Sequence, residues 1–254
     1  MPPAVVDAGD KWAAKIEAGF KAWVKDNEDK KPAEWGVFDL TPYIRGGVLD
    51  GLGVAANGLE EYGLGVKFDL RNPLTEAWIK KYSAQEIKYI DDSSKKAIRD
   101  IILRGQEEGL TSQEQARLIR QHIGLDPRRS KALLNYAEQL REAGATGQVL
   151  EKALAKYRQR LINDRAEVIA LTEGHTAANE GYRQGNVEAV RRGVLDPREW
   201  TRYWMITRDK HICTICEGLS GAEAILPDGH FEGDGRGPPK HQRCRCTEGL
   251  RRKR

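Results

Sequence analysis

Hydrophobic positions in the first 84 residues form one helical pattern and then lose any regular period. Between Lys11 and Val24, apolar side chains recur every three or four residues, which predicts an amphipathic helix. From Pro32 onward, prolines and glycines interrupt the sequence often, so an irregular arm is expected through residue 84. The arm is rich in large apolar residues, which predict that it becomes ordered by packing on the rest of the protein or on a neighbouring subunit. They are Trp35, Phe38, Tyr43, Leu49, Leu52, Tyr62, Phe68 and Trp78.

Residues from about 84 to 190 carry the three- and four-residue spacing of amphipathic helices. The first stripe consists of Ile87, Ile90, Ala97, Ile98, Ile101 and Ile102. Thr111–Glu114 matches a capping box, and its helix is expected to end at Gly124. Asp126 and Pro127 provide a second start signal, for a helix that ends at Gly144. Separate helices are predicted over 149–161 and 163–182, and their short connections indicate an antiparallel bundle.

The last predicted helix places one carboxylate, Glu173, among small apolar residues. A carboxylate in such a stripe is either paired with an arginine or functional. The ion pair is favoured because no second acid, nucleophile or oriented histidine accompanies Glu173 at a fixed spacing. His175 falls on a different face of the helix and is predicted to lie at the surface.

All four cysteines of the chain lie near its C-terminus. A C-x-x-C pair follows a short strand-like run, Arg202–Thr207, and two more cysteines come later. Thiolates at this spacing are ligands that tetrahedral zinc prefers, so we predict a structural zinc knuckle. Disulfides or free thiols are the second explanation, although charges in the first thirty residues argue against a secretory signal. Redox catalysis is the third, and the expected βαβ context is missing.

The predicted zinc knuckle has five candidate ligands for four positions. They are Cys213, Cys216, His241, Cys244 and Cys246. The C-x-x-C pair supplies two ligands, and because alternate residues of an extended chain face the same side, both later cysteines can reach the ion. If the chain turns before Cys244, the histidine replaces one of them. His211 and His230 are predicted to be ordinary loop histidines.

These patterns predict a mainly α-helical fold. It consists of a helical bundle with an irregular, aromatic-rich N-terminal arm and a small C-terminal β-hairpin that forms the zinc knuckle. The predicted divisions are an arm and linker over 1–84, a helical domain over 85–195, and the knuckle region with a basic tail over 196–254.

Charge is distributed unevenly along the 254 residues. The net charge is +4, and the segment from Pro197 onward holds all of it, with twelve Lys or Arg against eight Asp or Glu. This cationic end predicts non-specific binding to DNA phosphates, and a solvated tail is an equal alternative. Its cations are Arg243, Arg245, Arg251, Arg252, Lys253 and Arg254. No apolar run is long enough to cross a bilayer, so no membrane partner is expected.

Two parts of the sequence resemble the Mu-F-like phage head morphogenesis family, the minor capsid proteins of tailed phages. The first is the helical segment 165–173 with Ala177–Gly181 after it, where Leu171 stands at a position usually held by arginine. The second and more specific part runs from Trp200 to Cys246. It contains Trp200–Asp209, Cys213-x-x-Cys216, Gly218–Gly221, Phe231 and Pro238-Pro239-x-His241-x-x-Cys244-Arg245-Cys246.

The resemblance implies a virion protein, made in the bacterial cytoplasm and placed inside the head near the portal. It implies roles in capsid assembly and in genome packaging or ejection, with the portal protein, inner capsid proteins and packaged double-stranded DNA as partners. Some relatives carry toxin-like enzymatic domains beyond the knuckle. Since eight residues follow Cys246, no such domain and no enzymatic activity are expected here.

Two other functions fit parts of the sequence. A metal-dependent nuclease-like enzyme would use Asp209, His211 and His241 around a catalytic metal, but it lacks a paired carboxylate and an open coordination position. A zinc-ribbon DNA-binding regulator would need a recognition helix, and none is evident.

Overall fold

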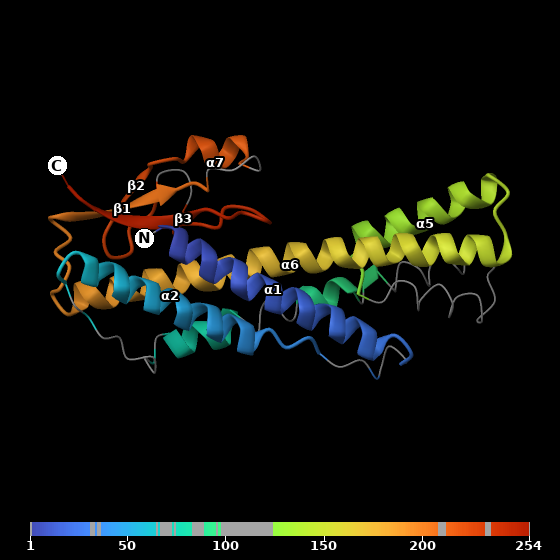
Figure 1. Ribbon diagram of the computed structural model, residues 1–254, viewed down its shortest axis with the longest axis horizontal. Helices are drawn as coiled ribbons and strands as arrows, with labels where there is room; N and C mark the ends of the chain where they lie inside the picture. The colour runs from blue at the N-terminus through green and yellow to red at the C-terminus, as the bar shows by residue number, and fades with distance from the viewer. Residues whose placement is uncertain are drawn as a thin grey trace. The chain divides into compact units, whose positions relative to one another are not determined.

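The computed structural model describes residues 2–30, 34, 37–64, 66, 73, 75–82, 89–94, 96–97, 124–207, 212–231 and 235–253. Its helices are α1 (Pro2–Asn27), α2 (Thr41–Glu61), α5 (Pro127–Glu142), α6 (Gly147–Arg191) and α7 (Thr214–Gly218). Its strands are β1 (Trp200–Met205), β2 (Glu223–Ile225) and β3 (Thr247–Arg252) (Figure 1). The predicted fold class is confirmed, since the protein is mainly helical with a small antiparallel sheet at its C-terminal end.

The chain forms two compact units, each built from separate segments. Unit 1 contains Met1–Glu17, Leu40–Ser83 and Val168–Arg254, and unit 2 contains Ala18–Asp39 and Ala84–Glu167. The long helices α1 and α6 therefore contribute residues to both units. The domain boundaries expected at 84 and 195 stay predictions.

The irregular arm was a wrong prediction for residues 41–61, which form the regular helix α2 although they include five glycines. Two of these glycines lie where α2 meets α6. A Cβ atom on Gly51 would come 2.1 Å from the carbonyl oxygen of Ala178, and one on Gly47 would come 2.6 Å from the Cβ of Ala177. Glycine permits this close backbone approach, so here it serves helix packing rather than helix breaking. The helix expected between Lys11 and Val24 is confirmed within α1.

One helix predicted for this part of the chain is confirmed, whereas two helices that were predicted to be separate form a single one. Asp126 caps α5 by accepting a hydrogen bond from the Arg129 backbone N–H at 2.9 Å, as its sequence predicts. The separate helices expected over 149–161 and 163–182 are one continuous helix, α6. The cap-type residue Asp164 instead binds Arg129, whose Nε lies 2.8 Å from Oδ2. The capping box at 111–114, like most of the stripe at 87–102, lies outside the described residues.

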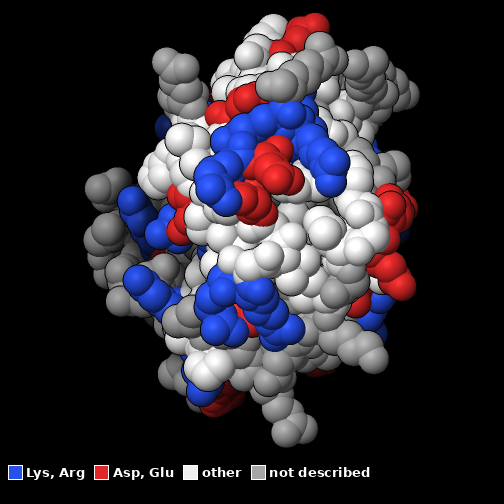
Figure 2. All heavy atoms as spheres, turned by 90° about the vertical axis from the view of Figure 1, so that its left-hand side faces the viewer, with Lys and Arg blue, Asp and Glu red and all other residues white. Residues whose placement is uncertain are grey.

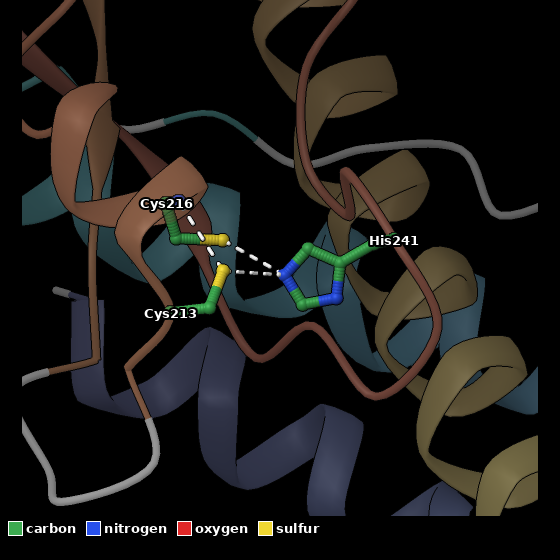
Figure 3. A group of neighbouring side chains, drawn as sticks. All are labelled: Cys213, Cys216 and His241. Carbon is green, nitrogen blue, oxygen red and sulfur yellow. Dashed lines mark hydrogen bonds between the residues drawn. The ribbon is translucent and has the colours of Figure 1, made fainter.

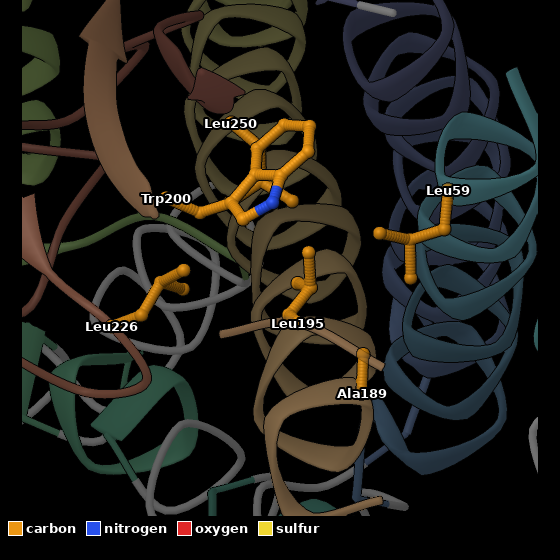
Figure 4. Packing of buried hydrophobic residues seen from close by; sticks show 6 residues of the cluster. All are labelled: Leu59, Ala189, Leu195, Trp200, Leu226 and Leu250. Carbon is orange, nitrogen blue, oxygen red and sulfur yellow. The ribbon is translucent and has the colours of Figure 1, made fainter. Parts of the chain in front are cut away.

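The sheet in unit 1 has the order β2-β1-β3, and both neighbours of β1 are antiparallel to it. The predicted hairpin is thus part of a three-stranded sheet. An apolar cluster connects the sheet to the helices through residues of α2, α6, β1, β3, the loop after α6 and the loop after β2 (Figure 4). It contains Leu59, Ala189, Leu195, Trp200, Leu226 and Leu250. The strand β1 also carries a buried arginine, Arg202, which pairs with the buried Glu248 of β3.

Candidate metal centre

The C-x-x-C pair lies at the start of α7. Cys213 is the N-cap residue, and its sulfur accepts a hydrogen bond from the Cys216 backbone N–H at 3.4 Å. This turn brings both sulfurs to one side, with Cys213 half-buried and Cys216 buried. All four cysteines of the chain are free thiols.

His241 approaches the C-x-x-C pair from a distant part of the sequence (Figure 3). Its Nε2 atom lies 3.1 Å from the sulfur of Cys213 and 3.1 Å from the sulfur of Cys216. Its Nδ1 atom lies 2.7 Å from the Gln242 carbonyl oxygen, to which an N–H at this position donates. That bond leaves the Nε2 lone pair directed at the sulfurs, which is the arrangement of a metal-binding histidine.

Cys244 and Cys246 complete a second group of three donors around Cys216. The sulfurs of Cys216 and Cys244 are 3.7 Å apart. Tetrahedral zinc with Zn–S bonds of about 2.3 Å separates two sulfurs by about 3.8 Å, so this spacing fits the ion. Both later cysteines lie in one donor group with Cys216, and they precede β3 rather than lie in it.

The two groups overlap at Cys216, and in each of them all ligand atoms lie within 4.8 Å of one another. They offer five donors where a tetrahedral ion takes four, so one donor is in excess. The set can hold a metal ion, and a site filled by four protein ligands leaves no position for a substrate.

The buried thiols differ in how readily they ionise. A hydrogen bond from Cys246 lowers the pKa of Cys244 to about 5, against the opposing effect of burial. The same bond, together with burial, raises the pKa of Cys246. Burial and the nearby Cys244 raise the pKa of Cys216 to about 12. A metal ion would stabilise thiolates that burial disfavours, so binding and proton release are coupled at this site.

The chain between His241 and β3 is attached to α6 by hydrogen bonds. The side-chain amide of Asn179 donates to the Cys246 carbonyl oxygen at 3.2 Å, and the Thr247 hydroxyl donates to Asn179 Oδ1 at 2.8 Å. The backbone N–H of Arg243 donates to the Thr172 hydroxyl at 3.2 Å. These hydrogen bonds hold the segment against α6, and they thereby also fix the positions of the metal donors within it.

His175 was predicted at the surface, and this prediction is wrong. Its side chain is fully buried, and its Nε2 atom lies 2.9 Å from Oδ1 of Asp10 in α1. That hydrogen bond lowers the pKa of Asp10, with Arg245 adding to the effect against burial. No local pattern indicates this contact, because the partner of His175 comes from a helix far away along the chain.

Glu173 is buried and accepts a hydrogen bond from the Tyr82 hydroxyl at 2.9 Å, while the arginine partner expected for it stays a prediction. Neither residue belongs to the donor groups around Cys216. His230 is exposed and also lies outside these groups, as predicted for a loop histidine. Asp209 and His211 lie outside the described residues, so the nuclease-like arrangement around them stays a hypothesis.

The predicted cationic residues lie in two different regions of the structure. Arg245 approaches Asp10, with 3.3 Å between its guanidinium nitrogen and Oδ2, and Arg243 lies beside α6. Arg251, Arg252 and Lys253 end the chain's last strand and its extension, while Arg254 lies outside the described residues. Figure 2 shows the face of the molecule that includes the end of this strand, where groups of Lys and Arg enclose acidic atoms.

The three C-terminal cations differ in their contacts. Arg251 forms an ion pair with Glu223 of β2. The Arg252 guanidinium lies 5.4 Å above the Trp200 ring, and Lys253 Nζ donates to the Pro197 carbonyl oxygen at 2.8 Å. The last two contacts are with neutral groups, although Lys253 also acts electrostatically on Asp196.

Comparisons with known protein families, curated proteins and solved structures found no match. Among the described residues, no helix has both the length and the apolar character needed to cross a lipid bilayer.

Proposed function

We propose that this chain is a non-enzymatic head morphogenesis protein of a tailed phage, a minor capsid component inside the head near the portal. The support is the pattern of residues from Trp200 to Cys246 that resembles the Mu-F-like family. The convergence of all five candidate ligands at Cys216 is the single observation that carries the proposal. A structural metal site would account for this spacing of cysteines and histidine, and such a site needs no open coordination position for catalysis.

In this proposal the ion is zinc. Sulfur and imidazole donors suit it, and four protein ligands are typical of a structural zinc site. The ion would fix the segment 241–246, and that segment would in turn hold the sheet on α6 through Asn179 and Thr247. A rigid attachment of this kind suits a protein placed between a capsid component and packed DNA.

The C-terminal cations would bind the phosphates of packaged double-stranded DNA without reading its sequence. Replacing both Arg252 and Lys253 by alanine should weaken DNA binding equally for unrelated sequences. The slope of log affinity against log salt should fall by about 2, since each phosphate contact contributes roughly one unit. Arg45→Ala is the control, because that guanidinium is paired with Glu76. Sequence-selective binding that persists at high salt would contradict this part of the proposal.

Particle fractionation tests the proposal as a whole. Purified phage particles that encode this chain would be separated into portal, shell and ejected DNA fractions, and the chain would be detected by mass spectrometry. We expect it in the particle, with the portal or the DNA fraction. Its presence only in infected cells would contradict a virion role, and metal-dependent nuclease activity lost in His241→Ala with the fold intact would favour the nuclease-like alternative.

A further inference from the structure

Trp204 of β1 is buried beside the candidate metal centre. Its side chain is 1% exposed and belongs to the same apolar cluster as Cys216, Cys244 and Cys246. Phe231 packs against the indole edge to face, with the ring centroids 5.4 Å apart and an interplanar angle of 88°. The ring is therefore held in one orientation, and so is the direction of its N–H group.

The indole N–H of Trp204 makes no hydrogen bond within the part of the chain that the structure describes, although the nitrogen is fully buried. Buried donors nearly always find a partner, because an unpaired one forfeits its bond to water. An unpaired buried donor next to a group of metal ligands therefore points to an acceptor that forms when the metal binds.

The strand register identifies that acceptor. Trp204 pairs with Glu248 of β3, so Cys246 is its diagonal neighbour two residues earlier in the chain. Alternate residues face the same side, and a diagonal neighbour is within reach of an aromatic side chain.

We propose that Trp204 is a positioning residue for the metal centre, whose indole N–H donates to the sulfur of Cys246 when that sulfur binds the metal. A thiol is a weak acceptor, whereas a metal-bound thiolate carries negative charge and accepts strongly. Cys246 is then one of the four ligands, and the donor in excess is His241 or Cys244. This inference rests on the proposed metal site and deepens it.

Two measurements on the full chain test the inference. In the first, the chain is loaded with ¹¹³Cd²⁺ and the indole ¹H–¹⁵N signal of Trp204 is compared with that of the metal-free protein. We expect this signal to move downfield on loading and to show a coupling to ¹¹³Cd through the hydrogen bond. A Trp204 signal that is unchanged in a loaded protein would overturn the inference. This experiment needs no variant at the site.

The second measurement compares Trp204→Phe with Trp200→Phe, because Trp200 is an equally buried tryptophan of β1 that packs in the other cluster. Loss of the hydrogen bond should weaken metal binding about tenfold in Trp204→Phe, as for other groups that contact metal ligands. With Co²⁺ as the probe, the sulfur-to-metal charge-transfer band should move to lower energy in Trp204→Phe and stay in place in Trp200→Phe. Equal spectra and affinities in both variants would overturn the inference.

Failure of the inference and failure of the metal site are distinguishable. If the unaltered chain binds Co²⁺ and Cd²⁺ but its Trp204 indole signal does not move on loading, the metal site stands and the role of Trp204 is refuted. If the unaltered chain binds neither Co²⁺ nor Cd²⁺, the proposed metal centre itself is refuted, and the inference falls with it.

Discussion

The interface between α2 and α6 and the C-terminal sheet are stabilised in different ways. The helices approach so closely that a Cβ atom on Gly51 would clash with the Ala178 carbonyl oxygen, and backbone contact supplies the interface. The sheet has strands of six, three and six residues. The apolar cluster beside it includes the buried cysteines Cys216, Cys244 and Cys246. A region with so little apolar surface needs additional constraints, which here are the candidate ligands and the bonds to Asn179. The two regions should therefore lose their structure under different perturbations.

Removing the metal should have the largest effect, and it should be confined to the sheet region. Structural zinc contributes on the order of 10 kcal/mol of apparent binding free energy in small domains, and this support is lost with a chelator. We expect hydrogen exchange of the β1 and β3 amides to become fast while the α2 amides stay protected, with reversal on adding zinc. Equal loss of protection in α2 would show that the two regions do not fail separately.

A larger residue at Gly51 should break the helix pair instead. Gly51→Ala should destabilise the protein by about 2 kcal/mol, because the new methyl group must displace backbone rather than a flexible side chain. Gly53→Ala in the same helix is the control, since nothing lies within 4 Å of its Cβ position, and it should stabilise by about 0.5 kcal/mol. Denaturant unfolding measures both changes. Metal content should stay the same in each variant, and its loss in Gly51→Ala would contradict the separation of the two regions.

The attachment of the metal-binding segment to α6 should contribute less. Asn179→Ala removes the amide that donates to the Cys246 carbonyl oxygen and accepts from the Thr247 hydroxyl. The free energy of unfolding should fall by about 1–3 kcal/mol, because both partner groups are buried and lose their hydrogen bonds. Asn163→Ala is the comparison on the exposed side of α6, with an expected change below about 0.5 kcal/mol. The free energies of unfolding can be compared directly. Equal values for the two variants would mean that Asn179 does not hold the segment.

The smallest expected effect concerns Asp10 and depends on pH. Because the pKa of Asp10 is lowered in the folded protein, its contribution to stability is present above the unfolded pKa of about 3.9 and is lost as the pH falls through the folded value. The contribution should stay below about 1 kcal/mol, since the carboxylate is partly exposed. The difference in unfolding free energy between the unaltered chain and Asp10→Asn should therefore shrink below pH 4. A difference that grows in this range would contradict the assignment.

Local signals in the sequence predicted the elements that depend on neighbouring residues. The Asp126 cap of α5, the stripe of α1 and the convergence of the cysteines all follow from spacing along the chain. The errors concern residues whose environment is set by distant segments. The glycines of α2 were expected to break a helix because their partner, α6, is not visible from their own neighbourhood. His175 was expected at the surface for the same reason, since its partner is Asp10.

The long helix α6 shows a further limit of local signals. Asn163 and Asp164 are typical cap residues, but they neither remove a backbone donor nor require a positive φ, so the helix continues through them. The unpaired N–H of Trp204 likewise has no sequence signature, because it arises from the strand register and the packing of Phe231.

If a metal ion holds the C-terminal region, it should be present in the reduced, freshly purified full chain, where metal content can be measured. Elemental analysis compares the unaltered chain with the double variant Cys213→Ser/Cys216→Ser, which keeps three of the five donors. The account predicts one zinc per unaltered chain and almost none in the variant. A metal-free unaltered chain whose β1 and β3 amides are fully protected from exchange would contradict it.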